Sequence, residues 1–286
     1  MADSDKVIIS CALTGVLANR DQCPWVPYTP VEIAAEACRA YEAGAAVVHI
    51  HAREPESGAP TFSVDIYRQI YEETRARCPV LINFSTGGLD VDIETKCAHV
   101  RAVKPELAAL NMGSMNYAKY SSRRKDFVFD LVFQNPFSEI RTLLTAMRES
   151  GVKPELECFD SGHTASVDPL LDMGLLDEPL QVRYILGVVG GIPASTEALA
   201  FQKSQVPRGS TWQVIGVSHQ QWRLVAAALA LEGHVRVGLE DNFYLGPGEM
   251  ARSNGDLVAK AARMARDVGR APATVEEARS LLGLST

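Results

Sequence analysis

Short apolar runs alternate with longer amphipathic stretches along the whole chain. Between the runs, apolar residues recur at three- and four-residue spacing, as in PVEIAAEACRAYEAG, VDIYRQIYEETRAR and PFSEIRTLLTAMRESG. That spacing is typical of a helix with one buried face, and runs rich in β-branched residues are typical of buried strands. Eight strands are predicted, at 7–13, 46–51, 80–85, 107–112, 155–160, 182–187, 212–217 and 234–240.

This alternation predicts the fold class. A strand that is followed by a helix pairs in parallel with the next strand, because only a crossover returns the chain to the same edge. Eight such units in one chain of 286 residues predict a (β/α)8 TIM barrel. A doubly wound sheet is the rival, but the turn after the first strand reads LTGVLANR and lacks the glycine pattern of a nucleotide loop. No linker or change in composition divides the chain, so residues 1–286 are expected to form a single domain.

The second predicted strand ends on two histidines, His49 and His51. Side chains alternate along a strand, so both imidazoles are expected to point the same way, at the barrel mouth where such folds place their chemistry. The pair could be a polar cap on the core, an acid–base pair or two ligands of a metal. Two imidazoles at this spacing suit zinc, which usually takes a third protein ligand in catalytic sites.

The eighth predicted strand, HVRVGLEDN, offers candidates for that third ligand. The period of two places Arg236, Gly238 and Glu240 on one face, and Asp241 and Asn242 follow directly. A structural ion pair between Arg236 and Glu240 at the barrel rim is the alternative reading.

Four further histidines are weaker candidates. His163 and His219 follow the fifth and seventh predicted strands and are rival ligands, although either could cap a helix or face solvent. His99 lies in a helical stretch, and His234 is expected in a turn at the opposite end of the barrel. We expect these last two to take no part in the site.

Glycine-bearing loops follow three of the strands, namely STGG at 85–88, NMGS at 111–114 and GVVGG at 187–191. Each could be a plain tight turn, since turns need glycine. All three are expected at the same mouth, where exposed backbone N–H groups could hold a carboxylate or a thioester oxygen.

Composition narrows the class of protein. The formal net charge of −7 argues against nucleic acid as a partner. The N-terminal segment lacks the pattern of a signal peptide, and no apolar run approaches the roughly 18 residues of a membrane span. Six scattered cysteines without a CxxC pair indicate free thiols in a reducing compartment. We therefore expect a cytoplasmic globular protein.

Several of these motifs, taken in order, resemble one known family. The strings CALTG, VVHIHARE, NFSTGG, LNMGSMNY, ILGVVGG and VRVGLEDN, together with the tail from ARSNGD, are similar to those of the β-keto acid cleavage enzymes. The best-described activity of this family is cleavage of 3-keto-5-aminohexanoate. The resemblance runs from about residue 7 to about residue 283 and rests mainly on HxHxR and GxEDN in one chain of barrel length.

The resemblance implies a reaction and a set of site residues. A β-keto acid and acetyl-CoA would give acetoacetate and a new acyl-CoA. A divalent metal, usually zinc, would be bound by His49, His51 and Glu240. The resemblance further implies Asp241 as the general base, Arg236 as the arginine that assists it, and Ser85 and Gly88 as the residues that bind the substrate carboxylate. Thr86 and Asn111, in the same glycine-bearing loops, are expected to contact substrate as well.

Two positions depart from the family pattern. Leu17 stands where the aminohexanoate enzymes have an acidic residue that contacts the substrate's amino group, whereas the arginine that follows it is retained as Arg20. Ala109 replaces a small hydroxyl residue before the LN of the fourth strand. We expect both Leu17 and Arg20 near the substrate, and an uncharged or apolar substituent on the β-keto acid.

The sequence leaves other functions open. A metal-dependent hydrolase of the amidohydrolase type and a zinc-type aldolase are the enzymatic rivals, and a barrel that only binds a carboxylate or acyl-CoA is the non-enzymatic one. In amidohydrolases the HxH motif belongs to the first strand, whereas here it follows the second. Iron, manganese or cobalt could replace zinc. The family resemblance suggests a homo-oligomer, often a tetramer.

Overall fold

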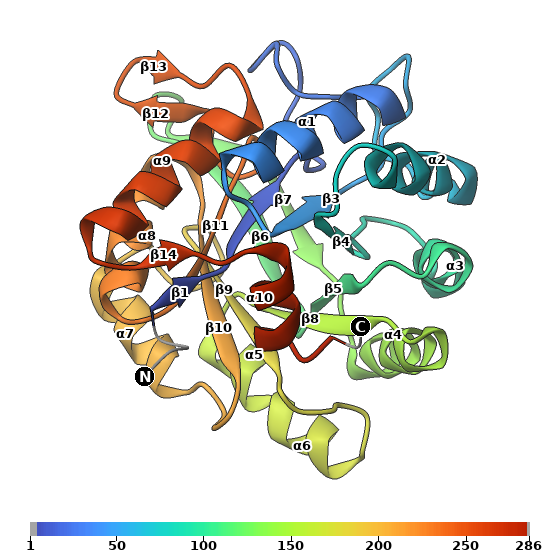
Figure 1. The fold of residues 1–286 in the computed structure, drawn as a ribbon. Helices are drawn as coiled ribbons and strands as arrows, with labels where there is room; N and C mark the ends of the chain where they lie inside the picture. The colour runs from blue at the N-terminus through green and yellow to red at the C-terminus, as the bar shows by residue number, and fades with distance from the viewer. Residues whose placement is uncertain (1–4, 285–286) are drawn as a thin grey trace.

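Eight parallel strands close into a barrel in the computed structural model, which describes residues 5–284. The order around the barrel is β10-β11-β2-β3-β4-β5-β8-β9, and helices surround it (Figure 1). The barrel strands are β2 Ile9–Ala12, β3 Val47–Ile50, β4 Leu81–Phe84, β5 Leu107–Asn111, β8 Lys153–Cys158, β9 Gln181–Leu186, β10 Thr211–Gly216 and β11 His234–Val237. Each falls on a predicted strand, so the predicted TIM barrel is confirmed.

The helices form the outer ring (Figure 1). They are α1 Pro30–Ala43, α2 Val64–Arg75, α3 Ile93–Val103, α4 Phe137–Ser150, α5 Ser161–Ala165, α6 Val167–Asp172, α7 Thr196–Ser204, the 3₁₀ turn η1 Ser218–Gln220, α8 Gln221–Ala230, α9 Asn254–Asp267 and α10 Val275–Leu281. Local sequence fixes their ends. In α1, Thr29 and Glu32 form a reciprocal capping box, and Gly44 ends the helix in the left-handed conformation. Across residues 5–284, no helix combines the length and apolar character needed to cross a bilayer.

The N-terminal end of the barrel is sealed. Val275 and Ala278 of helix α10, with Leu282 directly after the helix, pack against residues at the starts of the strands, among them Ile8 and Val47. The amide of Gln181 in β9 donates to the backbone oxygen of Leu282, 3.2 Å away. Two short strands, β1 Lys6–Val7 and β14 Ala271–Pro272, pair beside this plug. Figure 1 shows α10 in front of the barrel, so we expect the active site at the opposite, C-terminal end.

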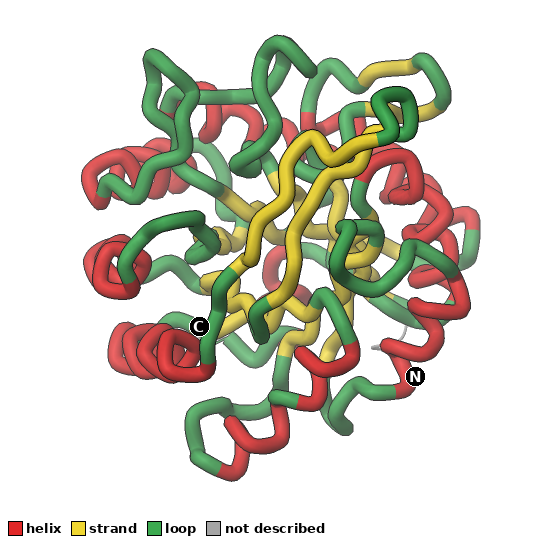
Figure 2. Tube along the Cα trace, turned by 180° about the vertical axis from the view of Figure 1, so that it is seen from behind, coloured by secondary structure: helices red, strands yellow, loops and turns green. Residues whose placement is uncertain are grey.

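A β-hairpin covers the opposite, C-terminal end of the barrel. Its strands, β6 Met115–Ser121 and β7 Asp126–Phe133, leave β5 and run diagonally over the barrel (Figure 2). The backbone N–H of Ala118 donates to the oxygen of Val189, 3.2 Å away, which ties the hairpin to the loop after β9. The hydrophobic pattern did not predict this hairpin. A second small hairpin, β12 Tyr244–Gly246 with β13 Glu249–Met250, follows β11.

The barrel interior is unusually polar. The guanidinium of Arg236 in β11 lies 3.2 Å from Glu157 in β8, although two strands separate them around the barrel. The amide of Gln213 in β10 donates to the hydroxyl of Ser10 in β2, which is likewise not a neighbouring strand. Such contacts cross the inside of the barrel. A buried charge is costly unless it is paired, and a buried polar group is costly unless it is hydrogen-bonded. Both contacts across the barrel meet this requirement.

Candidate active site

The two histidines at the end of β3 point to one side, as the strand alternation predicts. The ring centroids of His49 and His51 lie 5.1 Å apart. Each imidazole reaches the same carboxylate oxygen, because the Nε2 atoms of His49 and His51 lie 3.7 and 3.6 Å from Oε1 of Glu240. The hydroxyl of Thr14 holds the second histidine in place by donating to the backbone oxygen of His51 and accepting from its N–H.

Glu240 reaches the histidines from a loop and not from a strand. The prediction that the last strand runs to residue 240 is wrong, since β11 ends at Val237. Gly238 has a φ of 142°, and a Cβ there would lie 2.1 Å from the oxygen of Ala12. The chain therefore leaves the barrel at this glycine, and the backbone N–H of Glu240 still donates to that same oxygen. Gly15 makes room on the other side, where a Cβ would lie 2.7 Å from Cγ of Glu240.

His49, His51 and Glu240 form a group that could hold a metal ion. Their ligand atoms all lie within 4.8 Å of one another. Burial lowers the pKa of His49 to about 3, which keeps its imidazole neutral and able to ligate. Burial favours the protonated form of Glu240, but Arg236 and the two histidines outweigh it and hold the pKa well below its usual value. Its Oε2 is buried and has no hydrogen-bond partner. The donor set fits a divalent cation of the zinc type.

A second group of possible ligands, His49 with Glu155 and Glu157, is a poorer metal site. Each of its carboxylates already faces an arginine: Glu155 lies 2.9 Å from Arg183, and Glu157 lies 3.2 Å from Arg236. A cation placed there would be repelled by two buried guanidinium groups. The first group is the better metal site.

Arg236 is the centre of the charged cluster at the mouth. Its Nε and Nη2 donate to the two carboxylate oxygens of Asp241 at 3.0 and 2.9 Å. Nη2 also donates to Glu240 at 2.8 Å, and Nη1 donates to Glu157 at 3.2 Å. Burial raises the pKa of Asp241 to about 6, and Arg236 limits the rise. One guanidinium thus orients the candidate base and a candidate metal ligand together.

Glu157 is a member of this cluster that the sequence reading missed. Burial raises its pKa to about 8, with the charge of Arg236 opposing the rise. The run ELECFD predicted a strand, and alternation places Glu155 and Glu157 on one face of it. Two glutamates at alternate positions of a buried strand were the signal that could have found it.

The loop after β4 brings together most of the predicted substrate contacts. Ser85 and Thr86 are buried, and the hydroxyl of Thr86 donates to the oxygen of Ala109 at 2.6 Å, so it fixes the loop. A Cβ at Gly87 would lie 3.2 Å from Nδ2 of Asn111 and 3.6 Å from Oγ of Ser85. The predicted residues Ser85 and Asn111 therefore both lie next to Gly87.

Gly88 is required by packing. A Cβ at this position would lie 2.7 Å from the ring of Phe62. His99, expected to take no part, holds the same loop from behind through a hydrogen bond of 3.0 Å between its Nε2 and the backbone oxygen of Ser85.

Leu17 and Arg20 lie on the loop after β2. Leu17 is 49% exposed, whereas Arg20 forms an ion pair with Glu32 at 2.7 Å and stacks over the ring of Tyr28. Buried Arg53, the arginine of the HxHxR motif, braces the loop by donating to the backbone oxygens of Thr14 and Ala18. The guanidinium of Arg20 is already committed within the protein.

The remaining histidines lie apart from the metal-capable group. His163 is buried, and its Nδ1 accepts a hydrogen bond from the N–H of Phe159. His219 is exposed in η1 and contacts Gln220. His234 begins β11, so the expected turn is wrong, but it lies at the predicted far end, where its Nδ1 accepts from Ile8. Neither rival ligand joins His49 and His51.

Residues 6–284 match the family described as beta-keto acid cleavage enzyme. The chain belongs to this family. The match covers nearly the whole chain and confirms the resemblance seen in the sequence.

Curated relatives of this beta-keto acid cleavage enzyme family differ in the reactions that they are named for. The chain is 38% identical over 281 residues to the 3-keto-5-aminohexanoate cleavage enzyme of Fusobacterium nucleatum subsp. nucleatum, covering 98% of each protein. It is 34% identical over 304 residues to the 3,5-dioxohexanoate:acetyl-CoA acetone transferase of Paraburkholderia graminis, covering 99% of this chain and 97% of the relative. Comparable identities thus accompany different substrates, and overall similarity does not select one.

Solved structures show the same architecture. ObcA in a binary complex with oxaloacetate superposes with a TM-score of 0.77 at 21% identity, over 92% of this chain and 68% of that one. At this identity the likeness shows the fold alone.

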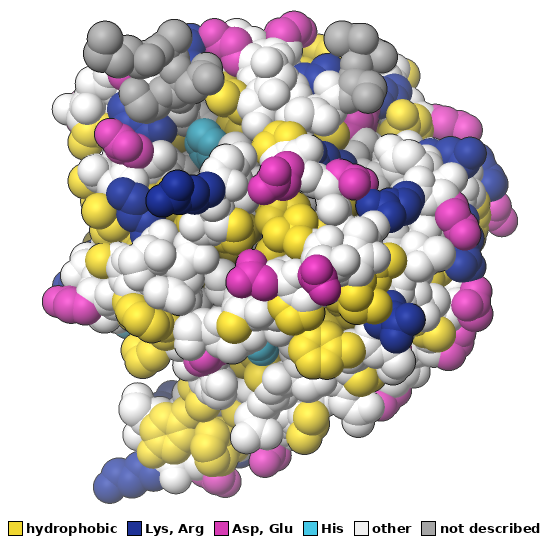
Figure 3. Space-filling view, turned by 90° about the horizontal axis from the view of Figure 1, so that it is seen from below, with side chains coloured by type: hydrophobic (Ala, Val, Ile, Leu, Met, Phe, Trp, Pro, Cys, Tyr) yellow, Lys and Arg dark blue, Asp and Glu magenta, His cyan; other side chains and the backbone are white. Residues whose placement is uncertain are grey.

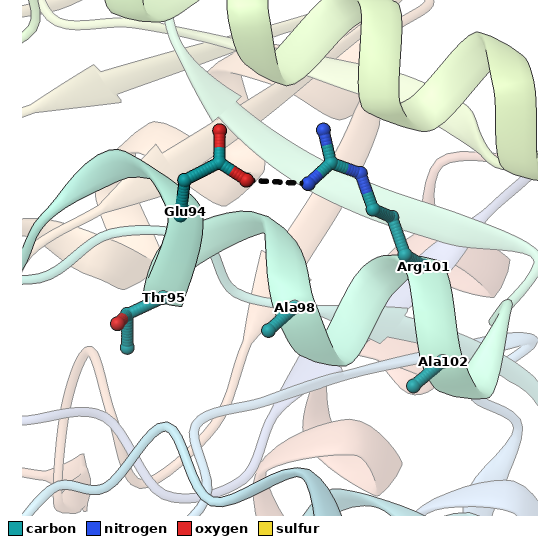
Figure 4. Close-up of a pocket in the computed structure, with 5 residues that line it drawn as sticks. All are labelled: Glu94, Thr95, Ala98, Arg101 and Ala102. Carbon is teal, nitrogen blue, oxygen red and sulfur yellow. Dashed lines mark hydrogen bonds and ion pairs between the residues drawn. The ribbon is translucent and has the colours of Figure 1, made fainter.

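A surface hollow on the outside of the barrel is not part of the site. It is lined by Glu94, Thr95, Ala98, Arg101 and Ala102, all on α3 (Figure 4). Its charged residues, Glu94 and Arg101, satisfy each other in an ion pair of 2.7 Å. No buried or unpaired catalytic group lines it among the residues described.

Proposed function

We propose that this protein is a metal-dependent β-keto acid cleavage enzyme that uses acetyl-CoA as co-substrate. The products would be acetoacetate and the acyl-CoA made from the rest of the keto acid. One observation carries the proposal: two imidazoles and the carboxylate of Glu240 converge beside an aspartate that Arg236 holds in a two-point contact. Names of relatives that include acetyl-CoA support the co-substrate.

His49, His51 and Glu240 would hold the metal, and zinc suits the donor set. A bound divalent ion supplies a Lewis acid that favours negative charge on keto and carboxylate oxygens. Asp241 would remove a proton from the carbon between the keto and carboxylate groups. Arg236 keeps its positive charge beside the carboxylates and so stabilises negative charge that develops on the substrate.

The atoms balance as an exchange of acyl groups. The deprotonated carbon attacks the carbonyl of acetyl-CoA, a new carbon–carbon bond forms, and the CoA thiolate leaves. The thiolate then attacks the original keto carbon, and the bond from that carbon to the former nucleophile breaks. The freed carbon takes back the proton from Asp241, which completes acetoacetate and leaves the acyl group as a thioester.

The substrate proposed is a β-keto acid with an uncharged or apolar substituent. Leu17 offers no charge to a cationic tail. Beside the mouth lies an apolar cluster of Met115, Phe159, Ile185, Val188 and Ile215, against which Tyr117, Phe133 and Val217 pack. An apolar substituent would gain from burial there, by roughly 25 cal/mol for each Å² removed from water. Ser85, Thr86, Gly88 and Asn111 would frame the carboxylate, with Arg20 holding the loop near Leu17.

The test is a panel of β-keto acids offered with and without acetyl-CoA, with elemental analysis of the purified protein. We expect acetoacetate only when acetyl-CoA is present, and one bound divalent ion per chain. Hydrolysis without CoA would support the amidohydrolase rival. Equal turnover of 3-keto-5-aminohexanoate and its apolar analogues would contradict the substrate assignment.

We also propose a cytoplasmic homo-oligomer, in agreement with the family resemblance. All six cysteines are free thiols, which supports a reducing compartment. Light scattering of the purified protein tests the expected tetramer.

A further inference from the structure

The root of the β6–β7 hairpin is fixed over the candidate site. Tyr117 packs its ring against Phe133 and Phe159, with centroids 5.8 and 6.3 Å away. A Cβ at Gly87 of the substrate loop would lie 3.8 Å from Phe133. Burial raises the pKa of Tyr117 to about 12, and the charges of Glu240 and Asp241 add to the rise. The hairpin therefore starts within the electrostatic reach of the catalytic carboxylates.

The tip of the hairpin carries three consecutive cations, Arg123, Arg124 and Lys125. All three are exposed, in a protein whose formal net charge is −7. The ion pairs found within residues 5–284 include none of them. The N–H of Arg124 donates to Oγ of Ser121 at 3.2 Å, so the turn has a defined shape. Such a cluster attracts phosphate groups.

Two aromatic rings stand directly beside these cations. Tyr120 and Phe127 face each other across the strands, with centroids 5.7 Å apart. In the single chain they are 50% and 47% exposed, which are large fractions for aromatic rings that pack on each other. Figure 3, seen from below, shows a projection at its lower left that ends in hydrophobic side chains and lysine or arginine. The hairpin lies on the back of the molecule, which is the face that Figure 2 shows. Exposed rings next to cations are the combination that binds a base and its phosphates.

We propose that the hairpin tip binds the adenosine 3′,5′-bisphosphate end of CoA, with Tyr120 or Phe127 against the adenine and Arg123, Arg124 and Lys125 on the phosphates. This rests on the proposed use of acetyl-CoA. The thioester must reach the mouth near Tyr117, while the nucleotide stays outside the barrel. The tip begins about six residues beyond Tyr117, or roughly 20 Å along an extended strand. The extended pantetheine arm and diphosphate of CoA span a distance of that order.

The decisive experiment compares acetyl-CoA with acetyl-pantetheine, which carries the same thioester but no nucleotide. In Arg124→Glu we expect the KM for acetyl-CoA to rise about tenfold, equivalent to about 1.4 kcal/mol, while the KM for acetyl-pantetheine stays at the wild-type value. Phe127→Ala should raise the KM for acetyl-CoA as well. This rise should depend less on salt concentration than the rise in Arg124→Glu, because the lost contact carries no charge. Free adenosine 3′,5′-bisphosphate should compete with acetyl-CoA in the wild type and lose that effect in Arg124→Glu.

Arg208→Glu is the matched control. Arg208 is an exposed cation in the loop before β10, at the sealed end of the barrel, and its reversal changes the net charge by the same amount. An equal rise in KM for both charge reversals would overturn the proposal, because only overall charge would matter. A change in oligomeric mass in Arg124→Glu with equal loss for both thioesters would also overturn it and assign the tip to a subunit contact.

Calorimetry with CoA alone separates this inference from the proposed function. CoA binding that depends on Arg124, in a protein that forms no acetoacetate, supports the site and contradicts the reaction. Acetoacetate formation with CoA binding that is unchanged in Arg124→Glu supports the reaction and overturns the site.

Discussion

Two buried arginines inside the barrel both pair with carboxylates, but in different surroundings. Near the sealed end, Arg183 pairs with Glu155 at 2.9 Å, and their side chains are 0% and 1% exposed. At the mouth, Arg236 contacts Glu157, Glu240 and Asp241, whose side chains remain 5–15% exposed. The lower pair is closed in by α10, while the upper cluster lies beside two metal-capable imidazoles and several loops.

The difference shows that a buried arginine–carboxylate pair does not by itself mark an active site. Both clusters must satisfy charge that has been removed from water. Each has a buried carboxylate oxygen without a hydrogen-bond partner, on Glu155 and on Glu240. The oxygen of Glu155 still lies 2.9 Å from Nε of Arg183, whereas only Glu240 offers its carboxylate to both His49 and His51, at 3.7 and 3.6 Å. We therefore expect the lower pair to matter for folding and the upper cluster for catalysis.

The largest effect on stability is expected from Arg183→Met. The change leaves the carboxylate of Glu155 buried without its partner, which costs about 3–5 kcal/mol in the free energy of unfolding. Urea denaturation measures the loss. The double variant Arg183→Met with Glu155→Leu should recover most of it, because an apolar pair of similar volume needs no charge partner. A double variant as unstable as the single one would show that the pair has a role beyond mutual neutralisation.

The largest effect on turnover is expected from Asp241→Asn. An amide cannot accept the proton, so kcat should fall by about 100- to 10,000-fold, the range typical of a lost general base. The hydrogen bond from Arg236 to the remaining oxygen should preserve the fold, which thermal unfolding checks. Near-normal turnover with a normal metal content would remove Asp241 from the mechanism.

Glu240→Gln should affect metal affinity more than stability. Loss of an outer-shell partner commonly weakens metal binding by about 10–100-fold, and loss of a direct ligand should exceed that. Competition against a chromophoric chelator gives the dissociation constant. Glu157→Gln is the matched control, since it also replaces a carboxyl group that contacts Arg236 but leaves the ligands of the first group in place. Equal affinity in the two variants would contradict the assignment of Glu240.

The smallest effect is expected from Leu17→Glu. Because Leu17 is 49% exposed, a new ion pair with a cationic substrate should contribute no more than about 1 kcal/mol. The ratio of kcat/KM for 3-keto-5-aminohexanoate to that for an apolar keto acid should therefore rise by about fivefold or less. A ratio that does not move would place the substituent away from this loop.

Much of the architecture could be predicted because it follows from local pattern. Eight apolar runs with helices between them determine a parallel barrel, and alternation along β3 sets the direction of His49 and His51. The same alternation gave a wrong prediction for the last barrel strand, because Gly238 turns the backbone out of β11 before Glu240. The carboxylate of Glu240 still lies near the two histidines, but it extends from a loop and not from the strand.

What escaped prediction depends on contacts between distant segments. Glu157 meets Arg236 only because β8 and β11 share the inside of one barrel. The β6–β7 hairpin escaped because its outer face is partly apolar, with Val132 58% exposed, so the sequence of β7 lacks a clean alternation of apolar and polar residues. The pattern of one segment does not reveal which surface it will cover.

The closure of the barrel between β11 and β2 has a consequence for synthesis of the protein. At roughly 5–20 residues per second on a ribosome, about ten to forty seconds separate the making of His51 from that of Glu240. Throughout that interval the nascent chain carries β2 with one edge unpaired, and an open edge invites aggregation. The two imidazoles can meet the carboxylate only after the last barrel strand has been made, so the candidate metal site is among the last parts of the protein that can form.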